Sequence, residues 1–99
     1  MILNGKQKRY LRSLAVTPRA DYQVGKDGLT FNLISGIKDD LRVHELVKVS
    51  LLKSCEEDLR EVALEASAQL GAELVQTICH TFILYKPNKD LGEKRIILP

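Results

Sequence analysis

The spacing of apolar residues in this 99-residue chain switches repeatedly between the period of an amphipathic helix and that of a strand. The pattern predicts helices at residues 4–15, 30–41 and 54–70 and strands at residues 22–24, 44–52, 74–78 and 81–86. Strands that alternate with helices run parallel to one another, whereas two strands joined by a tight turn run antiparallel. We therefore expect an α/β fold over residues 1–99, a single domain with one mixed four-stranded sheet and three helices in the order αβαβαββ.

The first predicted helix has a signal at each end. Asn4 is a residue type that caps helix N-termini. Thr17-Pro18 ends the segment, because the residue before a proline is disfavoured in the helical region. The apolar residues near one face of this helix are Leu3, Tyr10, Leu11 and Leu14.

The second and third helices have caps of their own. Thr30 is a suitable N-cap for the second, and Gly36 within it is expected to allow close packing on the sheet. Ser54 and Glu57 have the spacing of a capping box for the third, which Gly71 ends. The apolar stripe of the second helix is predicted to contain Phe31, Ile34, Ile37 and Leu41.

The strand at residues 44–52 is expected at the centre of the sheet, with His44 at its start. Only Cys79 and His80 separate the last two predicted strands, which should pair as a tight hairpin. Residues 88–93 are predicted to be a loop, and residues 95–98 a short edge strand.

Between the first strand and the second helix lies the turn Gly25-Lys26-Asp27-Gly28. Glycine has no Cβ, so the backbone of such a turn can adopt positive φ angles and approach a ligand closely. The helix that follows adds unpaired N–H groups and the positive end of its dipole. These features suit a phosphate, and the sequence has no nucleotide-binding motif, so the phosphates of a nucleic-acid backbone are the expected ligand.

Charge is distributed unevenly along the chain. Residues 1–26 carry six basic side chains against one acidic, whereas residues 39–73 carry nine acidic against four basic. In the first helix, Lys6, Lys8, Arg9 and Arg12 have no acidic neighbour to pair with. One positive face could therefore bind a polyanion while the other repels it.

Other classes of function find little support. Cys55, Cys79, His44 and His80 lack the spacing of a metal site or a catalytic pair, and no cofactor is implied. Both cysteines are expected to be reduced and partly buried. The sequence has no stretch long enough to span a membrane and no signal peptide, so we expect a cytoplasmic protein that makes no membrane contact.

The order and spacing of several short motifs resemble the CRM domain, and in particular the stand-alone YhbY-like RNA-binding proteins. The motifs cover nearly the whole chain and are residues 6–12, Val24-Gly25-Lys26-Asp27-Gly28-Leu29, His44-Glu45-Leu46-Val47-Lys48-Val49, Val75-Gln76 and Leu84-Tyr85-Lys86-Pro87. One departure is at the final hairpin, where relatives usually have Ile-Gly and this chain has Ile78-Cys79.

The resemblance implies a fold akin to the C-terminal domain of bacterial translation initiation factor three, and RNA binding through a loop comparable with the GxxG loop of KH domains. It also implies ribosomal RNA in precursors of the large ribosomal subunit as the partner. From the dispersed Cys and His residues we expect no catalysis, and we expect a monomer. The expected RNA-binding residues are Lys6, Lys8, Arg9, Arg12, Gly25, Lys26, Asp27, Gly28, Lys48 and Lys86.

An alternative is a protein-interaction module whose acidic third helix, residues 56–65, docks a basic ribosomal protein. This function is compatible with RNA binding on the opposite face. The chain has only three tyrosines and two phenylalanines, which argues against a sheet that stacks several bases. Recognition is then expected to rest on backbone phosphates and RNA shape.

Overall fold

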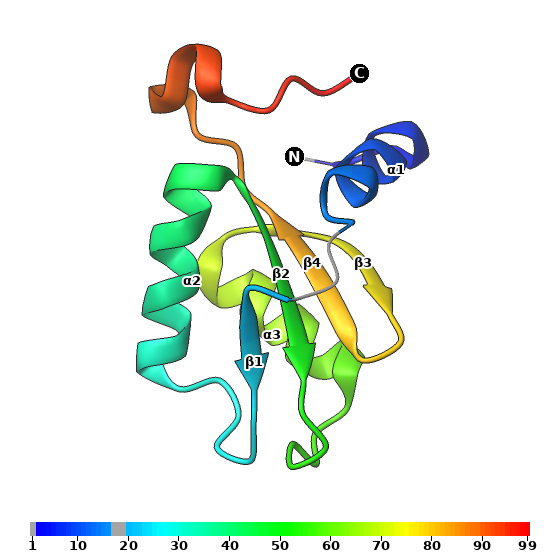
Figure 1. The fold of residues 1–99 in the computed structure, drawn as a ribbon, viewed down its shortest axis with the longest axis vertical. Coiled ribbons are helices and arrows are strands. Elements are labelled where there is room, and N and C mark those ends of the chain that lie inside the picture. Colours follow the sequence, from blue (N-terminus) through cyan, green and yellow to red (C-terminus); the bar gives the residue numbers. More distant parts are fainter. Residues whose placement is uncertain (1, 17–19) are drawn as a thin grey trace.

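The computed structural model describes residues 2–16 and 20–99 and confirms the predicted order αβαβαββ. The predicted helix break at Thr17-Pro18 lies outside the described residues. A short 3-10 helix, η1, follows the last strand (Figure 1). The elements are α1 Gly5–Leu14, β1 Tyr22–Val24, α2 Phe31–His44, β2 Leu46–Leu51, α3 Leu59–Leu70, β3 Glu73–Ile78, β4 Thr81–Tyr85 and η1 Lys89–Lys94.

The four strands form one mixed sheet in the order β1-β2-β4-β3. β1 runs parallel to β2, and the other two pairings, β2 with β4 and β4 with β3, are antiparallel. The predictions of a central strand near residues 44–52 and of a tight final hairpin are both confirmed. Val24 pairs with Leu51 at one end of the sheet, and Tyr85 pairs with Leu46 at the other.

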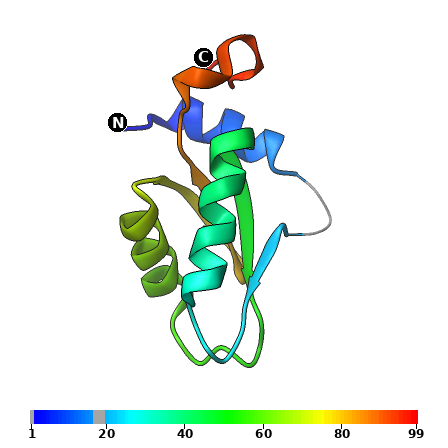
Figure 2. The same ribbon diagram turned by 90° about the vertical axis from the view of Figure 1, so that its left-hand side faces the viewer.

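Each face of the sheet has its own apolar core, because successive side chains of a strand point to opposite faces. Val49 and Phe82 belong to the larger core, under α2 and α3. Ile83 and Tyr85 belong to the smaller core, together with Leu11 of α1. Figures 1 and 2 both show α1 beside the C-terminal segment, at the end of the sheet away from the loop that follows β1.

Helix α1 begins with the predicted cap and adds a contact that the prediction did not include. The Asn4 side chain accepts a hydrogen bond from Gln7 N at 2.8 Å, and the Gln7 side chain accepts one from Asn4 N at 3.1 Å. The predicted apolar face is only partly correct. Leu3 and Leu11 are buried, but Tyr10 and Leu14 are exposed, because the buried stripe runs through Leu3, Leu11 and Ala15.

Helix α2 has the predicted N-cap, since Thr30 Oγ1 accepts a hydrogen bond from Leu33 N. The expectation of close packing at Gly36 is confirmed, because a Cβ there would lie 3.2 Å from Cε1 of Tyr22. The predicted apolar stripe is wrong at its first position. Leu33 and Ile34 pack against the core, whereas Phe31, at the start of the helix, is exposed.

The predicted capping box of α3 is also wrong. Asp58, not Ser54, caps the helix, and its carboxylate accepts a hydrogen bond from Glu61 N at 3.2 Å. Cys55 N instead donates to Leu52 O, which folds the residues around Ser54 into a turn before the helix begins. The predicted end at Gly71 is confirmed, with a left-handed φ of 63°.

His44 does not start a strand as predicted, because it is the last residue of α2. Glu45 follows it with a left-handed φ of 63° and turns the chain directly into β2. The Glu45 side chain points inward and is only 1% exposed. One left-handed residue therefore replaces the loop that usually separates a helix from the next strand.

The predicted edge strand at residues 95–98 is absent, and most of residues 88–93, predicted to be a loop, belong to η1. The buried Glu45 carboxylate accepts hydrogen bonds from Asn88 N at 2.7 Å and from Ile96 N at 2.5 Å. Ile96 N is thus bound by a side chain instead of a neighbouring strand. Ile96 and Leu98 then cover the smaller core. Within the described part of the chain, no helix has the length and apolar character needed to cross a membrane.

Candidate nucleic-acid interface

The Gly25–Gly28 segment forms a tight turn, closed by a hydrogen bond from Gly28 N to Gly25 O at 3.0 Å. Lys26 and Asp27 are exposed at its tip. Gly28 has a φ of 68°, and a Cβ at this position would lie 2.7 Å from Glu57 Oε2. The left-handed backbone conformation therefore favours glycine at residue 28, whereas the exposed Glu57 side chain could move away from a Cβ.

Gly25 is under a weaker constraint. A Cβ there would meet Ser54 Oγ at 3.5 Å and Leu52 Cδ1 at 3.8 Å, which are ordinary contacts. The turn leads into α2, whose first turn contains no acidic side chain. The positive dipole end of α2 and an exposed lysine at the turn favour an anion, and the carboxylates of Asp27 and Glu57 beside them oppose it.

Two further loops lie at the same end of the sheet as the Gly25–Gly28 turn (Figure 1). Leu52 N donates to Val24 O at 2.9 Å, which ties the loop after β2 to β1. Leu51 N donates to His80 O at 2.7 Å, which ties the β3–β4 turn to β2. We call these three loops together the loop end. Lys53 and His80 are exposed there, and neither is among the RNA-binding residues that the sequence analysis predicted.

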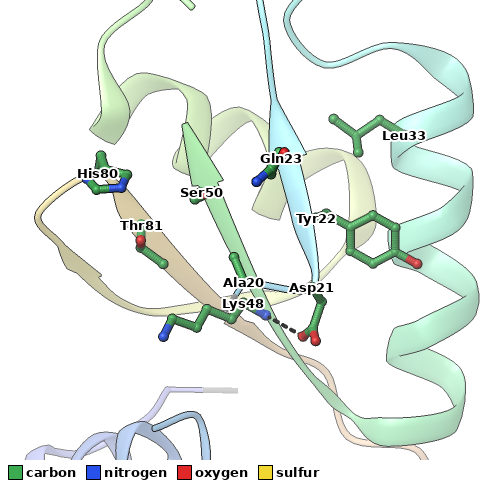
Figure 3. Close-up of a pocket in the computed structure, with 9 residues that line it drawn as sticks. All are labelled: Ala20, Asp21, Tyr22, Gln23, Leu33, Lys48, Ser50, His80 and Thr81. Carbon is green, nitrogen blue, oxygen red and sulfur yellow. Dashed lines mark hydrogen bonds between the residues drawn. The ribbon is translucent and has the colours of Figure 1, made fainter. Parts of the chain in front are cut away.

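Beside the loop end, part of the sheet face opposite α2 and α3 is hollowed. Figure 3 shows this hollow, of about 690 Å³, with Lys48, Gln23 and Ser50 projecting from neighbouring strands. We call it the sheet hollow. Its described lining residues are Ala20, Asp21, Tyr22, Gln23, Leu33, Lys48, Ser50, His80 and Thr81.

Lys48 connects the sheet hollow with α1. It also lines an adjoining hollow of about 350 Å³, together with Arg12 of α1 and Thr81. The Lys48 backbone is fixed by two contacts with Asp21 (Figure 3). Asp21 N donates to Lys48 O at 2.8 Å, and Lys48 N donates to Asp21 Oδ2 at 3.1 Å.

Tyr22 closes the edge of the sheet hollow against α2. Its hydroxyl donates to Gly36 O at 2.9 Å. Burial, reinforced by a hydrogen bond and the negative charge of Asp40, raises the pKa of Tyr22 to about 12. Tyr22 therefore joins β1 to α2, and its ring faces the helix (Figure 3).

The four predicted cations of α1, residues Lys6, Lys8, Arg9 and Arg12, are all exposed. Arg12 Nη1 donates to Gln76 Oε1 at 3.4 Å, a contact between α1 and β3. α1 contains no acidic residue. The structure thus places this basic surface on the same side of the sheet as Lys48, but at the opposite end from the Gly25–Gly28 turn.

Lys86 is not brought together with the other predicted site residues. It follows Tyr85, at the end of the sheet where Tyr85 pairs with Leu46. Its ammonium donates to Leu70 O at 2.9 Å and so binds a carbonyl at the C-terminus of α3. A cation there also interacts favourably with the helix dipole.

The residues considered for metal binding or catalysis are dispersed. His44 ends α2, Cys55 lies after β2, and Cys79 and His80 form the β3–β4 turn. Within residues 2–16 and 20–99, no three His, Cys, Asp or Glu side chains are placed to hold a metal ion. Both thiols are free; Cys55 is half-buried, but Cys79 is exposed, so its predicted partial burial is wrong.

Comparison with known proteins gives a consistent result. Residues 3–86 match the model of the CRS1 / YhbY (CRM) domain. The chain is 46% identical over 98 residues to the probable RNA-binding protein YqeI of Bacillus subtilis, covering 99% of this chain and 100% of that protein. It is 33% identical over 97 residues to an RNA-binding protein of Haemophilus influenzae, covering 98% and 95% of the two chains.

A solved structure is similar as well. The solution structure of a hypothetical protein from Staphylococcus aureus, described as a candidate RNA-binding protein, matches with a TM-score of 0.78 at 42% identity. The match covers 99% of this chain and 100% of the other. Fold, sequence and family model therefore agree over nearly the full length.

Proposed function

The chain belongs to the CRS1 / YhbY (CRM) domain family, and on this premise we propose that it binds ribosomal RNA in precursors of the large ribosomal subunit and assists their assembly. It acts by binding and not by catalysis. RNA backbone lies against the Gly25–Gly28 turn and the start of α2, and continues across the sheet face to α1. The names of its relatives support RNA as the ligand, and the ribosomal target is the more specific part of the proposal.

One observation carries the proposal. Lys48 lines both the sheet hollow, which begins two residues from the turn at Gln23, and the hollow that reaches Arg12. A single polyanion could therefore touch the turn, Lys48 and α1 along a continuous surface. Lys86 is outside this surface, because its ammonium is bound to the end of α3.

The acidic residues of α3 fit this orientation. α3 packs on the opposite face of the sheet from α1, and Glu61 and Glu65 are exposed on it. Their charge repels RNA from that side. The same exposed carboxylates would be available to a basic ribosomal protein, which is the second candidate function and is compatible with the first.

The ribosomal target is tested by crosslinking the protein to RNA in cells and mapping the crosslinked nucleotides. We expect a strong excess of large-subunit ribosomal RNA, concentrated in precursor particles. Crosslinks spread over messenger and transfer RNA in proportion to their abundance would contradict a ribosomal function while leaving RNA binding intact.

The contribution of α1 is tested by the double variant Lys8→Ala/Arg12→Ala. Each lost phosphate contact should reduce the slope of log affinity against log salt by about 0.7 to 0.9, so the pair reduces it by about 1.4 to 1.8. Sequence preference should not change, because phosphate contacts do not read bases. The matched control is Lys38→Ala/Arg60→Ala, which removes two exposed cations from α2 and α3. Equal slopes for the two double variants would exclude α1 from the interface.

A further inference from the structure

The phenyl ring of Phe31 is 86% exposed. The other aromatic side chains are placed differently. Phe82 and Tyr85 are buried, Tyr22 is bonded to Gly36, and Tyr10 is 39% exposed. Exposing a ring of this size to water is unfavourable, and such rings are a common means of binding flat ligands.

Packing within the protein does not explain the position of Phe31. It is the first residue of α2, and the helix packs on the sheet from Leu33 onward. Alanine at this exposed position would have a higher helix propensity. The ring therefore contributes little to the fold that a smaller side chain would not.

The location of Phe31 favours an RNA base as its partner. Phe31 is three residues beyond Gly28, so their Cα atoms are at most about 11 Å apart. A nucleotide whose phosphate lies on the turn can therefore reach the ring with its base. Lys26 is exposed in the turn, and Lys53 is exposed in the neighbouring loop. Both cations can attract RNA backbone to the loop end, where the carboxylates of Asp27 and Glu57 are exposed as well.

We propose that Phe31 is a stacking platform for an unpaired RNA base, so that the loop end selects single-stranded or looped RNA over continuous duplex. This inference rests on the proposed binding of RNA backbone at the Gly25–Gly28 turn. Bases in a duplex are already stacked on their neighbours, whereas an unpaired base is free to stack on an aromatic side chain. The ring thus adds a base contact to a site that would otherwise read only phosphates and shape.

The chain has no tryptophan, so Phe31→Trp introduces a single indole that reports stacking directly. We expect its fluorescence to be quenched when a short single-stranded oligoribonucleotide binds, and much less when the same strand is annealed to its complement. The matched control is Val43→Trp, at an exposed position near the other end of the same helix. Its fluorescence should not change on binding.

Affinity provides a second measurement. Phe31→Ala should weaken binding to the single strand by about 5- to 20-fold, as expected for the loss of one stacked base. Binding to the duplex should change less than twofold. Phe31→Tyr should retain single-strand affinity, because it retains a ring. Thermal melting of each variant should stay close to wild type, since the side chain is exposed.

The outcomes separate the inference from the proposed function. If Lys26→Ala weakens RNA binding while Phe31→Ala does not, and Phe31→Trp is not quenched in the complex, base stacking is wrong and backbone binding stands. If the unmodified protein binds neither RNA, both proposals fail. Loss of a protein partner from Phe31→Ala with unchanged RNA affinity would also overturn the inference and assign the ring to protein docking.

Discussion

The two ends of the sheet use their polar residues in opposite ways. At the end where β2 begins, which we call the anchor end, the buried Glu45 carboxylate binds the backbone of the C-terminal segment, and Lys86 binds the end of α3. At the loop end, Lys26 is exposed in the Gly25–Gly28 turn, and Lys53 is exposed in the loop after β2. The polar side chains of the anchor end therefore stabilise the fold, whereas the two lysines of the loop end stay exposed to solvent.

The backbone conformation and the burial of Glu45, at the anchor end, are both unfavourable in free energy. A left-handed conformation is unfavourable for a residue with a side chain, and a buried carboxylate loses its hydration. Two hydrogen bonds to backbone N–H groups offset these costs. The backbone of Glu45 takes part as well, since its carbonyl accepts a hydrogen bond from Lys86 N at 2.9 Å.

The largest effect on stability is expected from Glu45→Ala. The change leaves the N–H groups of Asn88 and Ile96 without their acceptor and opens a space in a buried region, so it should cost about 2 to 4 kcal/mol. Urea unfolding measures this directly. If the ends are independent, RNA affinity measured where the variant remains folded should stay within about twofold of wild type.

Glu45→Gln is the matched control, because it keeps an oxygen acceptor of the same length. It should recover part of the lost stability. If the folded Glu45→Ala protein lost RNA affinity as well as stability, the anchor end and the loop end would be coupled. That result would contradict the view that they act independently.

The next effect is expected within the loop end itself, from Gly28→Ala. The methyl group would occupy a left-handed position, so a loss of about 1 to 2 kcal/mol is expected, and the exposed Glu57 carboxylate would have to move aside. Gly25→Ala should be nearly neutral for stability, because its Cβ meets only ordinary contacts. Thermal melting distinguishes the two variants, and equal melting temperatures would contradict the preference for glycine at residue 28.

A smaller gain in stability is expected from Cys79→Gly. Cys79 is the first residue of the two-residue β3–β4 turn and has a φ of 56°, the position that glycine favours in type II′ hairpin turns. Glycine should stabilise the protein by up to about 1 kcal/mol. Cys79→Ala removes the same thiol but keeps the Cβ, so it should show no gain. Unchanged stability of Cys79→Gly in urea would mean that the turn is not strained.

The smallest effect on stability is expected from Tyr22→Phe, a change in β1 between the two ends of the sheet. Loss of the hydrogen bond to Gly36 O should cost about 1 kcal/mol or less at neutral pH, because the hydroxyl is only half-buried. Since the pKa of Tyr22 is raised to about 12 from an ordinary value of 10.0, its contribution is fully present below pH 10 and is lost as pH rises toward 12.

The measurement is the stability difference between wild type and Tyr22→Phe at each pH. Taking the difference removes the parallel contribution of Tyr85, whose pKa is also raised by burial and by Glu45. The gap should narrow between pH 10 and 12. A stability difference that stays constant from pH 10 to 12 would contradict the raised pKa of Tyr22 in the folded state.

The sequence predicted the local features well where a single residue type decides them. Asn4 and Thr30 cap their helices as expected, and Gly71 ends α3. The turn at residues 25–28 was also predicted as the junction between a strand and a helix. The candidate site was predicted in part, and its assignment to RNA contacts stays a prediction.

The errors occurred where the choice depended on residues far apart in the chain. Ser54 and Asp58 are both good caps. Leu52 N donates to Val24 O of β1, and Cys55 N donates to Leu52 O, so the residues around Ser54 form a turn and Asp58 caps the helix. Residues 95–98 have the composition of a strand, but the buried Glu45 binds the N–H of Ile96 and the segment covers a second core.

Periodicity, capping residues and glycine positions therefore determined the order of elements by themselves, because each acts within a few residues of the chain. The tertiary structure decided which polar side chains form hydrogen bonds within the protein and which stay exposed. Lys26 and Lys86 look alike in the sequence, yet Lys26 is exposed in the Gly25–Gly28 turn and the ammonium of Lys86 is bound to the end of α3. Phe31 was predicted to lie in the core and is exposed, because packing of α2 begins only at Leu33. Burial depends on the neighbours that folding brings together, and local sequence does not specify them.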